Sequence, residues 1–216
     1  GASRLDRTTV RTAAGHDAGV LSLWSTQRDR SAGFGDGTAF LASADTETAP
    51  DPDNDDWTCD RRECFDSRGR LVVPDYFGQT SGDGLDPCAA MSVHLVLAGG
   101  QSAERTFLMG YGATPQRAKD LLVSAIRLSA TQRLQQVRQG WQQLLGATTV
   151  KTPDDRLDAL VNHWLLYQAV SCRLWAKAGF YQAGGATGFR DQLQDAMALT
   201  WAAPEMLRQQ IVLCAS

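Results

Sequence analysis

The chain has 216 residues, of which 43% are hydrophobic and 21% are charged, the usual proportions of a soluble globular protein. Its 24 acidic and 21 basic residues are mixed along the sequence and give a net charge of −3, which excludes the basic face that nucleic-acid binding requires. No apolar run approaches the roughly 20 residues of a membrane-spanning helix, and the N-terminus lacks the layout of a signal peptide. The length suits one large domain or two small ones.

The sequence contains five cysteines, three of which lie within residues 59–88. The spacing closest to a metal site is offered by Cys59, Cys64, Cys88 and His94. This spacing fits no zinc pattern, so no metal site is predicted. Cys172 and Cys214 lie in apolar, helix-like contexts and are expected to be buried thiols. The odd number of cysteines argues against a disulfide framework and favours a reducing, cytoplasmic setting.

The first half of the chain contains short apolar runs separated by clusters of Gly, Asp and Pro, a texture typical of a β-sandwich. Strands are expected at residues 20–24, 71–73 and 92–97, with 105–109 as the partner of the last. Residues 44–56 are acidic and contain proline, which predicts a solvated loop.

Other polar features of this half are interpreted as surface structure. His16 is expected in a loop, and His94 is expected to point outward from its strand. Residues 33–37 read G-F-G-D-G, which vaguely resembles a phosphate-binding loop. They lack the lysine and the helix that follow such a loop, so a turn is predicted.

The second half changes to a helical spacing of apolar residues. Thr114-Pro115 is a helix-start signal, and the pattern is interrupted near Ser129 and ends at Gly146, so one broken helix or two are expected. Thr152 begins a second start signal, with an acidic residue three positions later. Further helices are expected at residues 157–178 and 190–201, and from Pro204 onward.

The helix expected at residues 157–178 is apolar on nearly every face, which indicates burial within a larger assembly. His163 is expected to be a hydrogen-bonded core histidine of that helix. The last helix reaches Ser216 without a capping residue, and Gly1 shows no natural beginning. We therefore expect the chain to be a fragment of a longer protein.

A segment near the end of the chain carries residues suited to sugar binding. Glycines at residues 184–188 allow the backbone to approach a ligand closely, and Arg190, Asp191 and Asp195 follow at the start of a helix. The two aspartates share one helix face. Carboxylates and guanidinium groups bordered by Trp and Tyr suit a polyhydroxylated ligand. The alternative is an ordinary acidic helix start, in which Arg190 pairs with a carboxylate.

These residues form the pattern Y-Q-x-x-G-x-x-G-F-R-D-Q-L-Q-D, preceded by N-x-W-L-x-Y-Q and C-R-L-W, and residues 85–90 read L-D-P-C-A-A. The set resembles glycoside hydrolase family 94, which holds inverting cellobiose and chitobiose phosphorylases, and most resembles its cyclic β-1,2-glucan synthase branch. The resemblance implies an α+β fold of several parts. These parts are the C-terminal portion of a β-sandwich at residues 1–112, a helical linker at 113–148, and the first helices of an (α/α)6 barrel at 149–216.

The resemblance also implies roles for the residues of the segment. Asp191 would hold hydroxyls of the sugar on the non-reducing side of the scissile bond, and Arg190 and Asp195 would complete the substrate-binding set by supporting the loop. Inverting phosphorolysis requires one carboxylic acid and attack by phosphate. The acid-bearing segment of the family, D-x-x-x-H-W-W-H-P-P, does not occur in this sequence. We therefore expect no catalytic residue here and place the general acid beyond Ser216.

The parent enzyme would act on a β-glucan or glucooligosaccharide, with inorganic phosphate as co-substrate and no cofactor. The expected partners are that ligand and the remainder of the parent chain, with a homo-oligomer left open. Neither nucleic acid nor a membrane contact from this segment is expected. The expected location is the bacterial cytoplasm, or the cytoplasmic face of the inner membrane for a glucan synthase. A non-catalytic carbohydrate-binding or structural module is the alternative.

Overall fold

The computed structural model describes residues 8–29, 35–44, 56–176 and 188–215. The chain divides into two compact units, Gly1–Ala130 and Thr131–Ser216. The first unit contains antiparallel sheets and the helix α2 (Pro115–Ile126), and the second is helical in its described part. The chain is therefore α+β, as the sequence predicted.

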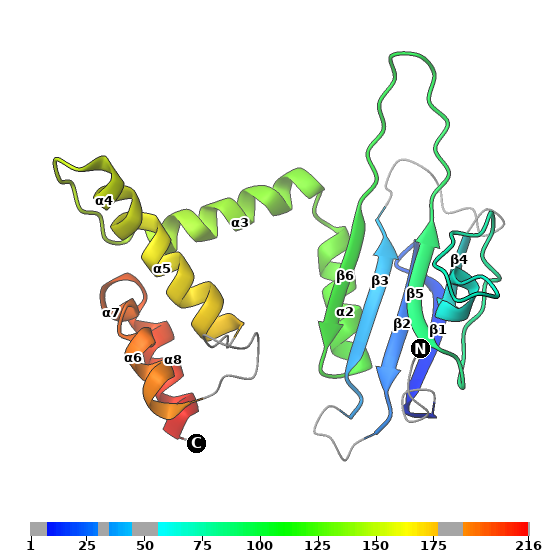
Figure 1. Ribbon diagram of the computed structural model, residues 1–216, viewed down its shortest axis with the longest axis horizontal. Helices are drawn as coiled ribbons and strands as arrows, with labels where there is room; N and C mark the ends of the chain where they lie inside the picture. The colour runs from blue at the N-terminus through cyan, green and yellow to red at the C-terminus, as the bar shows by residue number, and fades with distance from the viewer. Residues whose placement is uncertain (1–7, 30–34, 45–55, 177–187, 216) are drawn as a thin grey trace. The chain divides into compact units, whose positions relative to one another are not determined.

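The first unit is built on a four-stranded antiparallel sheet of strand order β1-β2-β3-β6 (Figure 1). Its strands are β1 (Val10–Asp17), β2 (Val20–Gln27), β3 (Thr38–Ser43) and β6 (Phe107–Gly112). A second antiparallel sheet pairs β4 (Asp56–Asp60) with β5 (Pro87–Ser92). Ala18 and Gly19 join β1 to β2 with positive φ angles of 55° and 84°, which produces a tight two-residue hairpin turn.

Strand β2 is covered on both faces. Because successive side chains of a strand point in opposite directions, Val20 and Trp24 face one way and Leu21 and Leu23 the other. The first pair packs in a buried cluster with residues of α2. The second pair packs against Cys59 of β4. Figure 1 shows the same arrangement, with α2 behind the four-stranded sheet and the β4–β5 sheet in front of it. The predicted strand at residues 20–24 is confirmed.

Helix α2 begins where the sequence predicts. The Oγ1 of Thr114 accepts a hydrogen bond from the backbone N–H of Arg117 at 3.3 Å, and Pro115 occupies the first helical position. The chain enters this helix directly from β6. Gly112 permits the close approach, because a Cβ at that position would lie 2.4 Å from the backbone nitrogen of Ala118.

Asp17 links the sheet to α2 through polar contacts. Its Oδ2 accepts hydrogen bonds from the indole of Trp24 and the hydroxyl of Ser22, both at 2.9 Å. The ammonium of Lys119 lies 3.2 Å from Oδ1 and 5.9 Å from the centre of the Trp24 ring. Burial opposes the charge of Asp17, but these hydrogen bonds and the nearby lysine keep its pKa below the ordinary value.

Several strand predictions for the first unit are wrong. Strand β5 ends at Ser92, and residues 93–106 form a long loop instead of a strand at 92–97. Residues 107–112 form a strand, but its partner is β3. Because β3 pairs with β6, the predicted pairing of residues 92–97 with 105–109 does not form. Residues 71–73 form only an isolated bridge, between Leu71 and Phe65.

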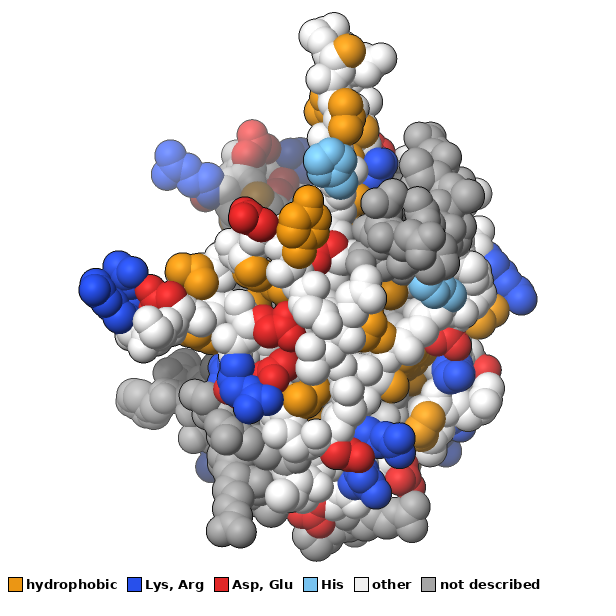
Figure 2. Space-filling model, turned by 90° about the vertical axis from the view of Figure 1, so that its right-hand side faces the viewer, with side chains coloured by type: hydrophobic (Ala, Val, Ile, Leu, Met, Phe, Trp, Pro, Cys, Tyr) orange, Lys and Arg blue, Asp and Glu red, His pale blue; other side chains and the backbone are white. Residues whose placement is uncertain are grey.

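The loop at residues 93–106 extends away from the sheet in Figure 1, and hydrophobic side chains lie along the projecting loop at the top of Figure 2. Its exposed apolar side chains are Leu95, Val96 and Leu97. His94 is exposed on this loop, not on a strand, and His16 is exposed on β1, not in a loop.

The second unit consists of helical segments in its described part. They are α3 (Ala130–Leu145), α4 (Asp155–Ala159), the π-helix η2 (Leu160–Trp164), α5 (Leu165–Gln168), the π-helix η3 (Ala169–Trp175), α6 (Phe189–Ala196), α7 (Leu199–Ala202) and α8 (Pro204–Ala215). Residues 127–129 separate α3 from α2, so the broken pattern corresponds to two helices. The predicted helix from Pro204 is confirmed. The helix predicted at 190–201 is divided, because α6 ends at Ala196 and α7 begins at Leu199.

Two features of the segment from α4 to η3 differ from the prediction. The N-cap is Asp154, whose carboxylate accepts from the N–H of Arg156, whereas Thr152 donates its hydroxyl to Asp158 at 2.8 Å. His163 is exposed and is not a core residue. His163 was predicted to be buried because its helix is apolar on nearly every face, but the other described residues pack against only part of that helix.

Aromatic rings of α3 and of the segment from α4 to η3 pack against one another. Trp141 lies 5.0 Å from Tyr167 and 5.3 Å from Trp175, measured between ring centroids. Trp164 and Leu165 stay exposed. Cys172, predicted to be buried, is exposed, and Cys214 is half-buried.

The predicted loop at residues 45–55, the first part of the predicted turn at 33–37, the end of the helix predicted at 157–178, and the glycine-rich turn at 184–187 lie outside the described residues. Within the described part of the chain, no helix is both long and apolar enough to cross a membrane.

Gly110 offers a test of the packing between β6 and β3. It lies opposite Phe40, and a Cβ at Gly110 would lie 2.5 Å from two atoms of the Phe40 ring. We expect Gly110→Ala to lower the free energy of unfolding by about 1–3 kcal/mol, because the ring must leave its position. Urea unfolding at neutral pH measures this change.

The matched control is Gly99→Ala, since a Cβ at Gly99 meets no described atom within 4 Å. This variant should stay within about 0.5 kcal/mol of the parent chain. Equal stability of the two variants would contradict the packing described for Phe40.

Candidate functional site

The predicted sugar-binding residues lie on and beside helix α6 in the second unit. Gly188 is the N-cap in an extended conformation and offers no side-chain cap. Asp191 lies in the first turn, and its Oδ2 is 3.5 Å from the position that a Cβ of Gly188 would occupy. The carboxylate therefore lies near the positive end of the helix dipole, which stabilises its charge. A Cβ at residue 188 would make an ordinary van der Waals contact with the Oδ2 of Asp191.

Arg190 and Asp191 are both exposed. Within the described part of the chain, neither side chain has a hydrogen bond or ion pair. The alternative expectation, that Arg190 pairs with a carboxylate, is therefore not met among the described residues. Asp191 presents two acceptor oxygens to its surroundings, as a residue that binds sugar hydroxyls must.

Asp195 has a different environment. Its carboxylate forms an ion pair with the guanidinium of Arg173, which joins α6 to η3. One helical turn away, the buried Gln192 accepts a hydrogen bond from the amide of Gln210 at 3.2 Å, which joins α6 to α8. These contacts fix the position of α6. The structure thus brings Asp195 into the helix packing and leaves Asp191 accessible, although both lie on one helix.

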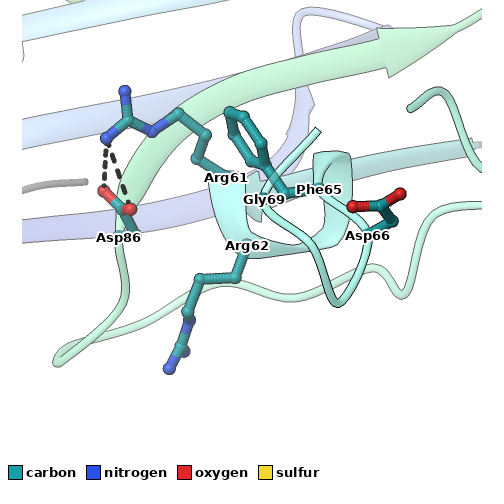
Figure 3. A pocket seen from close by; sticks show the side chains of 6 residues that line it. All are labelled: Arg61, Arg62, Phe65, Asp66, Gly69 and Asp86. Carbon is teal, nitrogen blue, oxygen red and sulfur yellow. Dashed lines mark hydrogen bonds and ion pairs between the residues drawn. The ribbon is translucent and has the colours of Figure 1, made fainter. Parts of the chain in front are cut away.

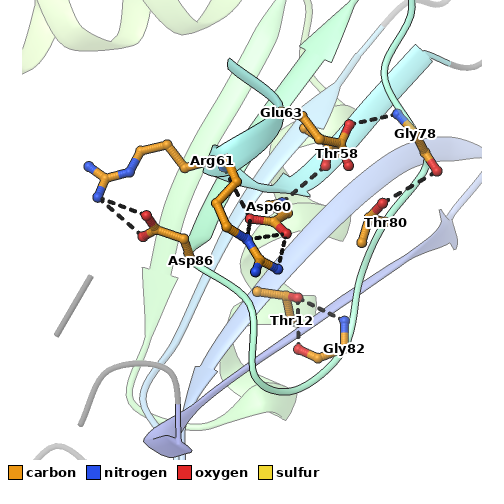
Figure 4. A network of polar contacts seen from close by, with 10 residues as sticks. Thr12, Thr58, Asp60, Arg61, Glu63, Gly78, Thr80, Gly82 and Asp86 are labelled. Carbon is orange, nitrogen blue, oxygen red and sulfur yellow. Dashed lines mark hydrogen bonds and ion pairs between the residues drawn. The ribbon is translucent and has the colours of Figure 1, made fainter. Parts of the chain in front are cut away.

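A second polar cluster, which the sequence analysis did not single out, lies in the first unit at the end of β4. The chain leaves β4 through the short 3-10 helix η1 (Arg61–Cys64), whose N-cap is Asp60. Figure 4 shows that side chains from β4, η1 and the segments that follow converge there. We call the set Asp60, Arg61, Arg62, Glu63 and Asp86 the η1 cluster.

Two ion pairs organise the η1 cluster. The Nε of Arg62 lies 2.8 Å from both carboxylate oxygens of the buried Asp60. The Nη2 of Arg61 donates to both oxygens of the buried Asp86, at 3.1 and 3.3 Å. The hydrogen bonds from Arg62 lower the pKa of Asp60, although burial acts in the opposite direction. Asp60 is therefore ionised at neutral pH, and the two ion pairs hold the turn in place.

Further hydrogen bonds tie the following segment to this cluster. Glu63 accepts from the backbone N–H of Gly78 at 2.7 Å. Thr12 of β1 donates its hydroxyl to the carbonyl of Gly82 and accepts from the N–H of Gly82, both at 3.0 Å. The later part of the segment between η1 and β5 is thus tied to η1 at Gly78 and to β1 at Gly82, as Figure 4 shows.

Beside η1 the surface encloses a hollow of about 450 Å³ (Figure 3). Its walls are formed by Arg61, Arg62, Phe65, Asp66, Gly69 and Asp86. This volume lies within the range of small-ligand sites. The signal in the sequence is the run D-R-R-E-C-F-D-S-R-G-R at residues 60–70, where charges of both signs surround an aromatic residue. Such runs usually belong to solvated loops, so the pattern alone does not indicate a site.

The cysteines weighed as metal ligands do not form a site in the structure. Burial raises the pKa of Cys59 to about 11 and that of Cys88 to about 12, so both thiols stay protonated at neutral pH. Zinc binds the thiolate. Among the described residues, no group of three His, Cys, Asp or Glu side chains is arranged to hold a metal ion.

Comparison with known proteins places the chain in a family. Residues 4–125 match the glycosyl hydrolase 94 supersandwich domain, and residues 140–216 match the catalytic domain of the glycosyl hydrolase 94 superfamily. Both descriptions belong to one class of proteins, the glycosyl hydrolases. The first match covers more than half of the chain, so the chain is a member of the glycosyl hydrolase 94 superfamily, as its motifs indicated.

Individual relatives include a synthase and phosphorylases. The chain is 35% identical over 171 residues to the cyclic β-(1,2)-glucan synthase NdvB of Rhizobium meliloti, covering 76% of this chain and 6% of that protein. It is 30% identical over 129 residues to the N,N'-diacetylchitobiose phosphorylase of Vibrio proteolyticus, covering 58% and 16%. It is 27% identical over 153 residues to the 3-O-β-D-glucopyranosyl-β-D-glucuronide phosphorylase of Paenibacillus borealis, covering 68% and 19%. The chain thus spans between 6% and 19% of the length of these relatives.

The pH dependence of the free energy of unfolding tests the role of Asp60 in the η1 cluster. The pKa of Asp60 is lower in the folded chain than its ordinary value, so in acid the unfolded chain binds more protons than the folded chain does. The stabilisation that the Asp60 carboxylate provides is therefore present at neutral pH. It is lost as the pH falls through the pKa of Asp60 in the folded chain. We expect Asp60→Asn to lower the free energy of unfolding by about 1–3 kcal/mol at pH 7. The difference from the parent chain should shrink below about pH 4, where the aspartate of the unfolded chain is protonated.

The matched control is Asp83→Asn, which removes the exposed ion pair between Asp83 and Arg28. An exposed pair contributes only about 0–1 kcal/mol, so this variant should unfold almost as the parent does. Urea unfolding between pH 3 and pH 8 measures both, and an Asp60→Asn effect that is independent of pH would contradict the assignment.

Proposed function

We propose that the chain is part of a carbohydrate-active enzyme that cleaves β-linked glucosides by inverting phosphorolysis, or processes them within a glucan synthase. Membership of the glycosyl hydrolase 94 superfamily supports this, and so do the activities for which its relatives are named, a cyclic β-(1,2)-glucan synthase, an N,N'-diacetylchitobiose phosphorylase and a 3-O-β-D-glucopyranosyl-β-D-glucuronide phosphorylase. Inorganic phosphate is the proposed co-substrate, because the phosphorylases among the relatives use it by definition.

Within that enzyme, we assign to this chain the loop that holds the sugar on the non-reducing side of the scissile bond. One observation carries the assignment. Asp191 is an exposed carboxylate at the start of a helix, and its oxygens have no side-chain partner among the described residues. A carboxylate of this kind can accept hydrogen bonds from two adjacent sugar hydroxyls. Arg190 and Asp195 support the loop, the latter through the ion pair with Arg173.

Inverting phosphorolysis needs one acid that protonates the leaving oxygen, and phosphate itself attacks the anomeric carbon. Asp191 does not take the acid role in this proposal, because a residue that binds hydroxyls through its ionised form cannot also be the proton donor. The general acid and the phosphate-binding groups are assigned to other parts of the parent enzyme.

The proposed organisation assigns residues 1–112 to a β-sandwich, 113–148 to a helical linker and 149–216 to the first helices of an (α/α)6 barrel. The exposed Trp164, Leu165 and Trp175 support a larger helical assembly, since such side chains are normally buried. The cytoplasm, or the cytoplasmic face of the inner membrane, is the proposed location.

Asp191 provides the direct test. In the full-length enzyme, we expect Asp191→Asn to lower kcat/KM for phosphorolysis of sophorose, the β-1,2-linked glucose disaccharide, by roughly a hundredfold or more. The expectation rests on the loss of charge-assisted hydrogen bonds, each of which contributes about 1.5–3 kcal/mol. Phosphate-dependent release of glucose 1-phosphate measures the rate.

Two variants serve as controls. Glu205→Gln, on an exposed carboxylate of α8, should leave kcat/KM unchanged. Asp195→Asn breaks the ion pair with Arg173 and should lower the thermal midpoint more than Asp191→Asn does. If Asp191→Asn kept the parent's kcat/KM, the proposed role of Asp191 would be wrong.

The 216-residue chain on its own is expected to release no glucose 1-phosphate from sophorose, because the general acid is assigned elsewhere. The measurement is an end-point assay over many hours at high protein concentration, with the full-length enzyme as the positive control. Any phosphate-dependent release of glucose 1-phosphate by the isolated chain would contradict the division of roles.

A further inference from the structure

The hollow beside η1 has a role that the proposed sugar-holding loop does not require. It lies in the first unit and shares no residue with the loop on α6. We propose that this hollow is a second carbohydrate site, which takes a neutral glucosyl unit of a β-glucan. The inference rests on the proposed function in one respect only, namely that β-glucosides are the ligands offered to this protein.

The charges of the hollow favour a neutral ligand over an anion. Two arginines and two aspartates line it, so the charges balance. Both guanidinium groups are already engaged, Arg61 by Asp86 and Arg62 by Asp60. A phosphate or another anion would meet the two carboxylates as well as the two guanidinium groups and would be repelled by the former. Hydroxyl groups, in contrast, can donate to the carboxylates and accept from the remaining N–H groups.

The hollow retains donors for such hydroxyls. Only Nη2 of Arg61 contacts Asp86, and Nη1 has no hydrogen bond within the described part of the chain. The side chain of Arg61 is 41% exposed, so this donor group is accessible while its partner Asp86 is buried and fixed. Figure 3 shows the guanidinium and its carboxylate at one side of the hollow. Polar groups held in this way meet a ligand without reorganisation.

Phe65 supplies the apolar part of the site. Its ring is 40% exposed although it stands in a run of charged residues, and Figure 3 shows it at the wall of the hollow next to the stem of Arg61. The C–H face of a glucosyl ring can pack on an aromatic ring while its equatorial hydroxyls reach polar groups at the edge. An aromatic face beside paired guanidinium and carboxylate groups is the combination that a pyranose needs.

The backbone around the hollow is rigid enough to act as a binding surface. Asp66 accepts from the N–H groups of Arg68 and Arg70 at 2.9 Å, and Gly69 adopts a positive φ of 73° that closes the turn. The bridge between Phe65 and Leu71 holds the ends of this turn together. These contacts hold Phe65 and Asp66 in a hydrogen-bonded turn, in a site whose walls come from residues 61–69 and from Asp86, which precedes β5.

The test is a titration of the 216-residue chain with sophorose, followed by amide chemical shifts, with inorganic phosphate as the anion probe. We expect sophorose to shift the amides of Phe65, Asp66 and Gly69 in a saturable way and phosphate to leave them unchanged. Phe65→Leu should weaken this binding roughly tenfold, because it removes the aromatic face and keeps an apolar side chain. Arg61→Lys should weaken it too, because lysine retains the charge and loses the fork of donors.

The matched control is Phe107→Leu, since Phe107 is another exposed phenylalanine of the first unit, 47% exposed on β6. It should bind sophorose as the parent chain does. Thermal unfolding of each variant confirms that it is folded at the temperature of the titration.

The outcomes separate this inference from the proposed function. Sophorose shifts confined to the residues around Gly188 and Asp191 would overturn the inference and leave the proposed function standing. Saturable shifts at the hollow together with full activity of Asp191→Asn would support the inference and contradict the proposed function. Binding of phosphate alone at the hollow, unchanged binding in Phe65→Leu, or no response to sophorose anywhere would each overturn the inference.

Discussion

The burial of strand β2 on both faces is the constraint on which the first unit depends. A strand alternates its side chains, so a single strand can support two cores only if apolar residues occupy both sets of positions. Residues 20–24 meet this condition, with Trp24 toward α2 and Leu23 toward β4. The helix and the second sheet are therefore placed by the same five residues. Asp17 adds a polar link on the helix side, where it accepts from Trp24 and pairs with Lys119.

The position of the η1 cluster follows from this packing. Cys59 of β4 is buried against β2, so the end of β4 is fixed, and Asp60 begins η1 at that point. The carboxylates of Asp60 and Asp86 are then buried, which is tolerated because each is paired with an arginine. The arginines keep part of their donors available. A structural network and an accessible hollow thus arise from the same residues, and this makes the hollow a candidate site.

In the second unit, helix α6 likewise combines residues that make packing contacts with residues that remain accessible. Asp195 and Gln192 join α6 to its neighbours, and the first turn of α6 remains accessible. A preorganised binding loop requires this arrangement: supporting residues fix the helix, and a nearby carboxylate faces outward. The accessible Asp191 and the accessible hollow lie in separate units, so each site is defined by its own contacts.

The sequence predicted those parts of the structure that depend on local signals. The strand at residues 20–24, the helix start at Thr114-Pro115 and the helix from Pro204 are present because hydrophobic period and capping residues act over a few positions. The alternating run at 92–97 predicted a strand paired with residues 105–109, but the strand that forms at residues 107–112 pairs with β3. Local pattern cannot show which segments pair.

For the candidate sites too, the sequence predicted local features but not those that depend on contacts between distant residues. The motif from Gly188 to Asp195 was recognisable in the sequence, but the difference between Asp191 and Asp195 was not, since the ion pair with Arg173 spans 22 positions. The hollow was not predicted, because its walls combine residues 61–69 with Asp86, which immediately precedes β5. His163 was assigned to a core on the assumption that an apolar helix is covered, and the described residues cover only part of it.

The central claim is that Asp191 holds the sugar on the non-reducing side of the scissile bond. A crystal structure of the full-length enzyme with sophorose and phosphate tests it most directly. The account predicts the Asp191 carboxylate within about 2.5–3.0 Å of two adjacent hydroxyls of the non-reducing glucosyl unit, with Asp195 still paired to Arg173. A sugar bound in the active site without contact to Asp191, or an Asp191 carboxylate turned into the helix packing, would contradict the account.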